Sequence, residues 1–165
     1  FRSGITSQYG DALPLFCDPV SSAYARRLKP YVGKVHTLKP NRMELTVLTG
    51  HDTDTPKGVK AACEILLCRG VKRIFVSMGH EGCLYMDSEG NVVQRALSPI
   101  ENIANVSGAG DAFTAAVIYS YLKGFGINRT IDYALAAGAV AVSAATTINP
   151  EISPELIEKI IIERG

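Results

Sequence analysis

The amino-acid sequence predicts an α/β fold in which a mainly parallel β-sheet is flanked by helices and ends in an antiparallel edge hairpin. Three observations support this fold class. Short apolar runs alternate with amphipathic helical segments through the first half of the chain. Two strand patterns then follow each other with only a turn between them, and the rest of the chain has helical periodicity. Strands separated by helices pair in parallel, whereas strands joined by a tight turn pair antiparallel.

The first strands and helix are predicted near the start of the chain. The apolar run Leu13–Cys17 is followed by Asp18, which is typical of a buried strand with a polar residue at its carboxyl end. Ser21 can cap a helix over residues 23–31. A second short strand is expected over residues 34–38.

The next two helices have clear boundary signals. Asn41 is a natural N-cap, and Glu44 stands three residues later, which is the spacing of a capping box. This helix is expected to run through Leu48. Another helix is expected over residues 55–67, where a Thr-Pro pair opens it and Gly70 follows its end.

The remaining segments complete the sheet and add helices. Apolar runs predict strands over residues 71–78, 83–87 and 91–97. Helical patterns cover residues 110–122, 131–145 and 154–162. Because the sequence contains no internal repeat and no linker, one compact unit is expected.

Composition disfavours several classes of protein. Of the 165 residues, 47% are hydrophobic and 20% are charged, values that are ordinary for a globular domain. Seventeen Lys and Arg almost balance 16 Asp and Glu, so no strong field attracts nucleic acid. No apolar run reaches the length of a membrane span. Neither a nucleic-acid partner nor a membrane is therefore expected.

The four cysteines indicate a reducing compartment. They contain no C-x-x-C pair and match neither a zinc site nor a disulfide framework. We therefore expect buried thiols and a cytoplasmic location. The chain starts at Phe1 without an initiator Met, so it is expected to be the middle of something longer and organellar targeting stays open.

The most informative segment is a glycine turn before a predicted helix. It reads Asn105-Val106-Ser107-Gly108-Ala109-Gly110-Asp111-Ala112-Phe113. Because Gly108 and Gly110 lack Cβ atoms, the backbone can bend tightly there and an anion can approach its N–H groups. These N–H groups have no intrahelical partner, and the helix dipole adds positive potential. The turn suits the charge that develops on a transferring phosphoryl group.

Asp111 lies in the first turn of this helix, where the dipole favours its negative form. It can accept the proton of a hydroxyl nucleophile. On spacing alone, a glycine-rich helix start with a favourable first-turn charge explains the segment equally well. The turn is not the dinucleotide fingerprint, because Phe113 occupies the last glycine position, and it lacks the lysine of a P-loop. A dinucleotide-dependent oxidoreductase is therefore disfavoured.

The segment Ser107–Phe113 resembles the C-terminal signature of the PfkB/ribokinase family of carbohydrate kinases. Residues 39–45 look like the family's N-x-x-E motif, residues 76–82 like its strand–glycine turn, and residues 133–142 like its late nucleotide-pocket helix. The matches occur in the family's order and cover nearly the whole chain. The resemblance implies a ribokinase-like, Rossmann-type layered fold and ATP-dependent phosphorylation of a sugar or nucleoside hydroxyl.

Within the family, residues 18–21, 36–41 and 105–108 look most like pseudouridine kinases, which phosphorylate the 5′-hydroxyl of pseudouridine. Family members are much longer than this chain. Residues 1–165 are therefore expected to be the C-terminal nucleotide-binding part of a kinase domain, with the N-terminal sugar-binding half and the lid absent. The chain alone is expected to be inactive.

The resemblance also assigns roles to single residues. The resemblance implies that Asp111 is the catalytic base and that the backbone of Gly108, Ala109 and Gly110 forms the anion hole. It assigns nucleotide contacts to Asn41, Ser77, Gly79, Gly82, Leu135 and Gly138. Asn41 and Glu44 are expected to organise Mg²⁺ through water, which suits the preference of this ion for oxygen ligands.

Structural explanations of several of these residues stay open. A capping box alone explains Asn41 and Glu44. A hairpin turn explains Gly79 and Gly82. Helix packing explains the small residues that follow Leu135 as well as a nucleotide pocket does.

ATP and Mg²⁺ are the cofactors that the resemblance implies. Dependence on K⁺ stays open, because Asn105 stands where the family commonly has an Asp near a monovalent-cation site. The expected partner is a small-molecule sugar or nucleoside substrate; a fused glycosidase domain and a homodimer of the full-length protein are also compatible with the resemblance. A nucleotide-binding regulatory module without catalysis is the alternative function.

Overall fold

The computed structural model describes residues 13–98, 108–143 and 149–164. The strands are β1 (Phe16–Cys17), β2 (Thr37–Leu38), β3 (Arg73–Ser77), β4 (Cys83–Asp87) and β5 (Val92–Arg95). The α-helices are α2 (Ser22–Leu28), α3 (Arg42–Thr49), α4 (Pro56–Cys68), α5 (Ala109–Leu122), α6 (Ile127–Ser143) and α7 (Pro154–Arg164). Two 3₁₀-helices are η2 (Lys29–Lys34) and η3 (Gly79–Glu81).

The chain divides into two compact units. Unit 1 comprises Phe1–Met78 and Leu84–Val93, and unit 2 comprises Gly79–Cys83 and Gln94–Gly165. The expectation of one compact unit is therefore wrong. The chain passes between the units after β3, inside β4 and inside β5 rather than in a linker, which is why composition gives no sign of the division.

The sheet confirms the predicted fold class. Its five strands lie in the order β1-β2-β3-β4-β5. β1 pairs with β2 and β2 with β3 in parallel, as the intervening helices require. β4 and β5 are joined by a tight turn in which the Asp87 N–H donates to the Asn91 carbonyl oxygen at 3.2 Å. The result is a mixed sheet flanked by helices.

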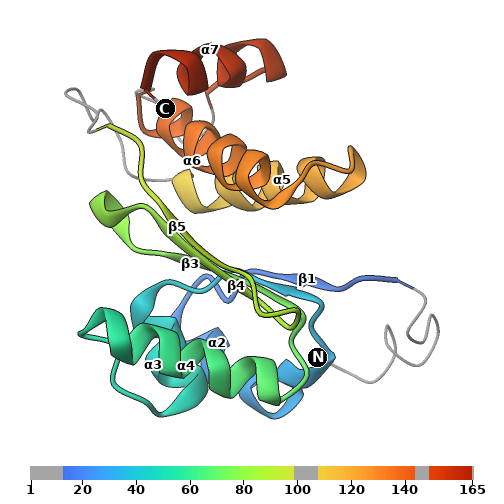
Figure 1. The fold of residues 1–165 in the computed structure, drawn as a ribbon, viewed down its shortest axis with the longest axis vertical. Coiled ribbons are helices and arrows are strands. Elements are labelled where there is room, and N and C mark those ends of the chain that lie inside the picture. Colours follow the sequence, from blue (N-terminus) through green and yellow to red (C-terminus); the bar gives the residue numbers. More distant parts are fainter. Residues whose placement is uncertain (1–12, 99–107, 144–148, 165) are drawn as a thin grey trace. The chain divides into compact units, whose positions relative to one another are not determined.

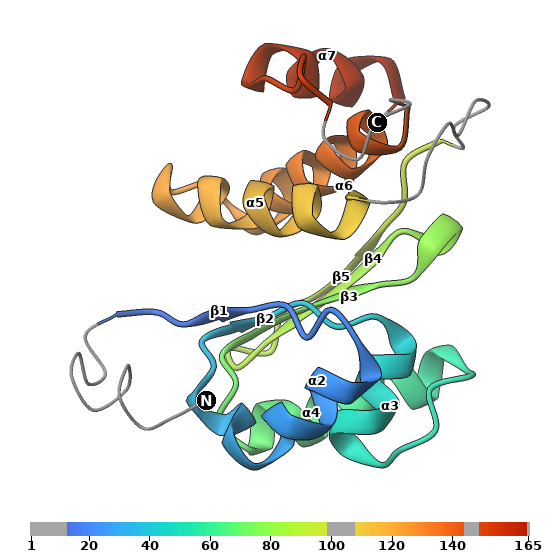
Figure 2. The ribbon, with the colours of Figure 1, turned by 180° about the vertical axis from the view of Figure 1, so that it is seen from behind.

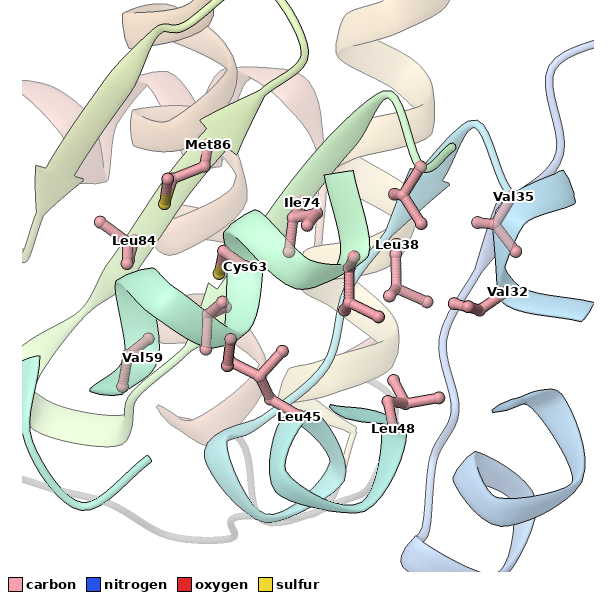
Figure 3. Packing of buried hydrophobic residues seen from close by; sticks show 14 of the residues in the cluster. Val32, Val35, Leu38, Leu45, Leu48, Val59, Cys63, Ile74, Leu84 and Met86 are labelled. Carbon is pink, nitrogen blue, oxygen red and sulfur yellow. The ribbon is translucent and has the colours of Figure 1, made fainter. Parts of the chain in front are cut away.

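The core of unit 1 lies between its strands and its helices. Figures 1 and 2 show α2, α3 and α4 together on one side of the strands of this unit. Because side chains alternate along a strand, every second residue of β3 and β4 reaches this core. Figure 3 shows side chains of the strands packed against side chains of α3 and α4. The strand residues are Leu38, Ile74, Leu84 and Met86, and the helix residues are Leu45, Leu48, Val59 and Cys63.

The predicted helix starts are confirmed by their caps. Asn41 and Glu44 form a complete capping box, and α3 ends at Gly50, which adopts the left-handed conformation with φ 79°. The Thr55 hydroxyl accepts a hydrogen bond from the Gly58 N–H at 3.0 Å at the start of α4. The Ser21 hydroxyl accepts from Tyr24 at 3.3 Å at the start of α2. Local sequence therefore fixes these three helix starts.

Unit 2 is built around α6, which packs against both α5 and α7. The Tyr119 ring of α5 stacks on the Tyr133 ring of α6 with centroids 5.5 Å apart. Arg129 of α6 forms an ion pair with Glu158 of α7 at 2.6 Å. The sequence places the start of α6 at residue 131, four residues too late, because the polar residues before it hide the apolar periodicity.

In the part of the chain that the structure describes, no helix has the length and apolar character that a membrane crossing requires.

Candidate functional site

The carboxyl ends of β1, β2 and β3 bring polar residues together in unit 1. Asp18 follows β1, Lys39 follows β2, and Ser77 is the last residue of β3. An isolated parallel β-bridge joins Asn41 to Ser77, and the Ser77 N–H donates to the Pro40 carbonyl oxygen at 2.9 Å. Ligands of open α/β sheets bind at this end of the strands. The structure therefore places two of the predicted nucleotide-binding residues, Asn41 and Ser77, side by side at such an edge.

The capping box of α3 holds the two predicted magnesium residues. The Asn41 N–H donates to Glu44 Oε2, and the Glu44 N–H donates to Asn41 Oδ1, both at 2.9 Å. The structural explanation of this motif is thus confirmed. Glu44 is 3% exposed, and within the described residues its Oε1 accepts no hydrogen bond.

The donor chemistry of this pair fits Mg²⁺. A carboxylate oxygen and an amide oxygen are hard ligands, and Mg²⁺ is usually held by one or two carboxylates together with water and substrate phosphates. Residues 13–98, 108–143 and 149–164 contain no group of three or more His, Cys, Asp or Glu side chains placed to hold a metal ion. A magnesium site built on Asn41 and Glu44 would need water and phosphate for its remaining ligands.

The structure also shows an ion pair at the same edge of the sheet, which the sequence analysis did not predict. Lys39 Nζ lies 3.0 Å from Asp18 Oδ2, and the two side chains are only 9% and 13% exposed. The signal that could have identified it is the strand register: Cys17 pairs with Leu38, so the next residues of both strands are Asp18 and Lys39. Burial first, and then the nearby carboxylates of Asp18 and Glu44, raise the pKa of the Cys17 thiol to about 11.

The glycine turn before α5 lies in unit 2. Gly108 is the N-cap of α5 and adopts the left-handed conformation with φ 85°, where a side chain would be strained. Since Gly108 has no side chain, this N-cap residue supplies no side-chain oxygen to the N–H groups of the first turn. Asp111 lies in the first turn and is exposed to solvent. Ser107 and Asn105 lie outside the described residues.

A second predicted site residue lies against this turn. A Cβ added at Gly138 of α6 would be 3.6 Å from the Ala109 carbonyl oxygen of α5. Tertiary packing thus brings Gly138 to the start of α5 from a distant part of the sequence. Leu135, one turn earlier on α6, is half-buried.

The turn between β3 and β4 requires both of its glycines. Gly79 and Gly82 have φ values of 60° and 82°, which other residues rarely adopt. A Cβ at Gly82 would also clash with the Arg95 carbonyl oxygen and with Ala96, whereas nothing lies near a Cβ at Gly79. Backbone geometry therefore explains Gly82 without a ligand, and its predicted role in nucleotide binding stays a prediction.

Comparison with protein families agrees with the motifs placed above. Residues 5–154 match the model of the pfkB family of carbohydrate kinases. The chain belongs to the PfkB family. The matched region includes the capping box of α3, the β3–β4 turn and the start of α5.

Curated relatives of this PfkB-family chain act on different substrates. It is 32% identical to pseudouridine kinase of Escherichia coli K12 over 142 residues, which are 86% of this chain and 45% of the relative. It is also 32% identical to 1-phosphofructokinase of Haemophilus influenzae over 164 residues, 98% of this chain and 51% of that protein. The chain thus spans about half the length of these relatives.

Solved structures confirm the ribokinase-like fold. A sugar kinase structure from Clostridium perfringens is 27% identical, with a TM-score of 0.88 over 96% of this chain and 50% of that chain. A structure described as ribokinase II from E. coli in complex with ATP and Mg²⁺ is 26% identical, with a TM-score of 0.75 over 86% of this chain and 44% of that one.

Proposed function

We propose that this chain is the C-terminal nucleotide-binding part of a kinase that transfers the γ-phosphoryl group of ATP to a hydroxyl group of a sugar or nucleoside. The observation that carries the proposal is the start of α5, where the N-cap is a glycine, which has no side chain to cap the backbone N–H groups, and an exposed carboxylate lies in the first turn. This arrangement supplies an anion-binding turn and a proton acceptor on one helix end. Membership of the PfkB family and the relative solved with ATP and Mg²⁺ support it.

The residues of each unit have separate roles in the proposed reaction. In unit 2, Asp111 accepts the proton of the acceptor hydroxyl as its oxygen attacks the γ-phosphorus, and ADP leaves. The N–H groups of Gly108, Ala109 and Gly110 stabilise the negative charge that develops on the phosphoryl oxygens. Gly138 and Leu135 contribute to the nucleotide pocket.

In unit 1, Asn41 and Glu44 hold Mg²⁺ through water, and Ser77 contacts the nucleotide. When bound, Mg²⁺ neutralises part of the phosphate charge. The exposed Gly79 at the β3–β4 turn, which belongs to unit 2, leaves its surroundings open to a phosphate or a ribose.

The acceptor that we propose is the 5′-hydroxyl of pseudouridine. The match to pseudouridine kinase, which covers most of this chain, supports this choice. The match to 1-phosphofructokinase has the same identity, so the acceptor must be measured. The test is a panel of pseudouridine, ribose, deoxyribose and fructose 1-phosphate with the longest natural polypeptide that contains this chain. We expect the highest kcat/KM with pseudouridine, and a higher value with any other compound would reject this assignment.

Asp111→Asn in the same polypeptide tests the proposed chemistry. We expect phosphate transfer to fall by roughly 10²- to 10⁴-fold, the usual contribution of a general base, whereas the Kd of ATP stays nearly constant. Glu155→Gln is the matched control, because Glu155 is also an exposed acid in the first turn of a helix of unit 2. ATP binding without transfer to any acceptor in the unaltered polypeptide would indicate a regulatory module instead of a kinase.

A further inference from the structure

Val20, in the turn that follows β1, has a backbone conformation that does not suit its side chain. Its φ is 62°, and in the part of the chain that the structure describes it is the only residue other than glycine with a positive φ. This left-handed region is unfavourable for L-residues and rare for β-branched ones, whereas glycine adopts it without strain. Strained residues of this kind persist where the surrounding structure enforces them, and they cluster at functional sites.

The turn is held by hydrogen bonds on both sides of Val20. The Val20 N–H donates to Asp18 Oδ1 at 3.0 Å, and the Ser21 N–H donates to the Pro19 carbonyl oxygen at 2.6 Å. Asp18 is itself fixed by its ion pair with Lys39. These contacts explain the shape of the turn, but all of them would form equally well with a glycine in place of Val20. They leave the isopropyl group unexplained.

Packing in the folded chain does not explain the valine side chain either. Val20 is 68% exposed, so its isopropyl group gains little free energy from burial. Strain and exposure therefore both disfavour valine at this position as far as stability is concerned. The combination favours a contact between the Val20 side chain and a ligand.

The position of the turn indicates which ligand this is. The strands β1, β2 and β3 are parallel neighbours with β2 in the middle, so their carboxyl ends share one edge of the sheet. Asn41 and Ser77, which we assign to the nucleotide, lie after β2 and at the end of β3. Val20 follows β1, on the side of β2 away from β3. A substrate that lies along this edge beyond the nucleotide reaches Val20, and that substrate is the phosphoryl acceptor.

We propose that the Val20 side chain packs against the apolar face of a ring of the acceptor and contributes to its selection. This inference rests on the proposed function and deepens it, because it assigns an acceptor contact to the same edge of the sheet. Sugar and nucleoside rings present carbon atoms that an isopropyl group contacts through dispersion attraction. Because the turn is rigid, the contact loses little conformational entropy when the acceptor binds. The strain at Val20 thus presents an apolar group among polar strand ends.

The first test separates acceptor binding from nucleotide binding. The longest natural polypeptide that contains this chain is assayed with ATP and the best acceptor of the panel described above. We expect Val20→Ala to lower kcat/KM for the acceptor by roughly 5- to 50-fold, the effect of losing a partial apolar contact, and to leave the KM of ATP unchanged. Val20→Ile keeps a branched apolar group and should retain most of the activity. Val92→Ala, at an exposed valine of β5, is the matched control and should change neither value.

Val20→Gly excludes a folding defect as the cause. It removes the isopropyl group and also relieves the strain, so the midpoint of denaturation should rise while kcat/KM for the acceptor falls at least as far as in Val20→Ala. A lower midpoint would contradict the strain at Val20 on which the proposal depends. Unchanged acceptor kcat/KM in Val20→Ala, or an equal loss for ATP, overturns the role of Val20 while the proposed function stands. No phosphate transfer by the unaltered polypeptide to any acceptor of the panel overturns both.

Discussion

Asn41 and Ser77 lie side by side because a parallel β-bridge joins the residue that caps α3 to the last residue of β3. A capping residue is thereby fixed to the sheet edge where ligands of this fold class bind. The capping role of Asn41 and its proposed ligand role can be separated by mutation. The Asn41 side-chain oxygen accepts a hydrogen bond from the Glu44 N–H and so caps α3, and we propose that the same residue binds Mg²⁺ and nucleotide.

The first prediction compares two helix caps of unit 1. Asn41→Ala should lower the free energy of unfolding by about 1 kcal/mol, the usual cost of a lost N-cap, and should also weaken binding of ATP with Mg²⁺. Thr55→Ala removes the cap of α4 and should cost a similar amount of stability with no effect on ATP. Chemical denaturation and ligand titration measure the two quantities. Equal ATP affinity in both variants would show that Asn41 is only a cap.

The second prediction concerns Gly138, which lies against the start of α5. Gly138→Ala places a Cβ at 3.6 Å from the Ala109 carbonyl oxygen, an ordinary contact, and should raise the unfolding free energy by about 0.5–1 kcal/mol through helix propensity. Gly138→Leu fills the space beside the anion turn and should weaken ATP binding. Ala139→Leu adds the same side chain one position along α6 and serves as the control. ATP binding that is unaffected by Gly138→Leu would remove Gly138 from the nucleotide pocket.

The third prediction separates two causes of glycine preference at turns. Gly82 and Gly90 both have a positive φ, 82° and 92°, but only a Cβ at Gly82 would meet the backbone of Arg95 and Ala96. Gly90→Ala should therefore cost about 1–2 kcal/mol, the strain of the left-handed region. Gly82→Ala should cost clearly more, because strand β5 must also move. Thermal and denaturant unfolding of both variants measure the difference, and equal costs would contradict the close approach seen at Gly82.

The fourth prediction is a pH dependence of stability that comes from His36. Burial lowers the pKa of His36, and the positive charges of Arg73 and Lys72 lower it further. The unfolded chain therefore takes up a proton at His36 before the folded chain does. The contribution of neutral His36 to the free energy of unfolding is fully present above the ordinary pKa of 6.5 and falls as the pH drops below that value.

Replacing the ring tests this source of pH dependence. His36→Gln should reduce the loss of unfolding free energy between neutral and mildly acidic pH, measured by denaturation at a series of pH values. His51→Gln, a change at an exposed histidine, should leave the pH profile of the unaltered chain in place. If the free energy of unfolding of His36→Gln falls with decreasing pH as steeply as that of the unaltered chain, a group other than His36 causes the loss of stability at acidic pH.

The sequence by itself determined the starts of α2, α3 and α4, the approximate locations of the strands, and the family. Ser21, Asn41 and Thr55 cap the helices that follow them because a cap depends only on residues within one turn. The glycine–aspartate turn before α5 was recognisable for the same reason, since its residues are adjacent in the chain. Local chemistry of this kind can be read without knowing the rest of the fold.

Only the tertiary structure decided which distant residues meet. The pairing of Lys39 with Asp18, the bridge from Asn41 to Ser77 and the approach of Gly138 to Ala109 all depend on strand register or helix packing. The division into two units was equally hidden, because its boundaries fall inside a β-hairpin. Strand register and helix packing depend on how the whole apolar core is buried. Burial of the core involves all the helices and strands together, so no short segment of the sequence predicts it.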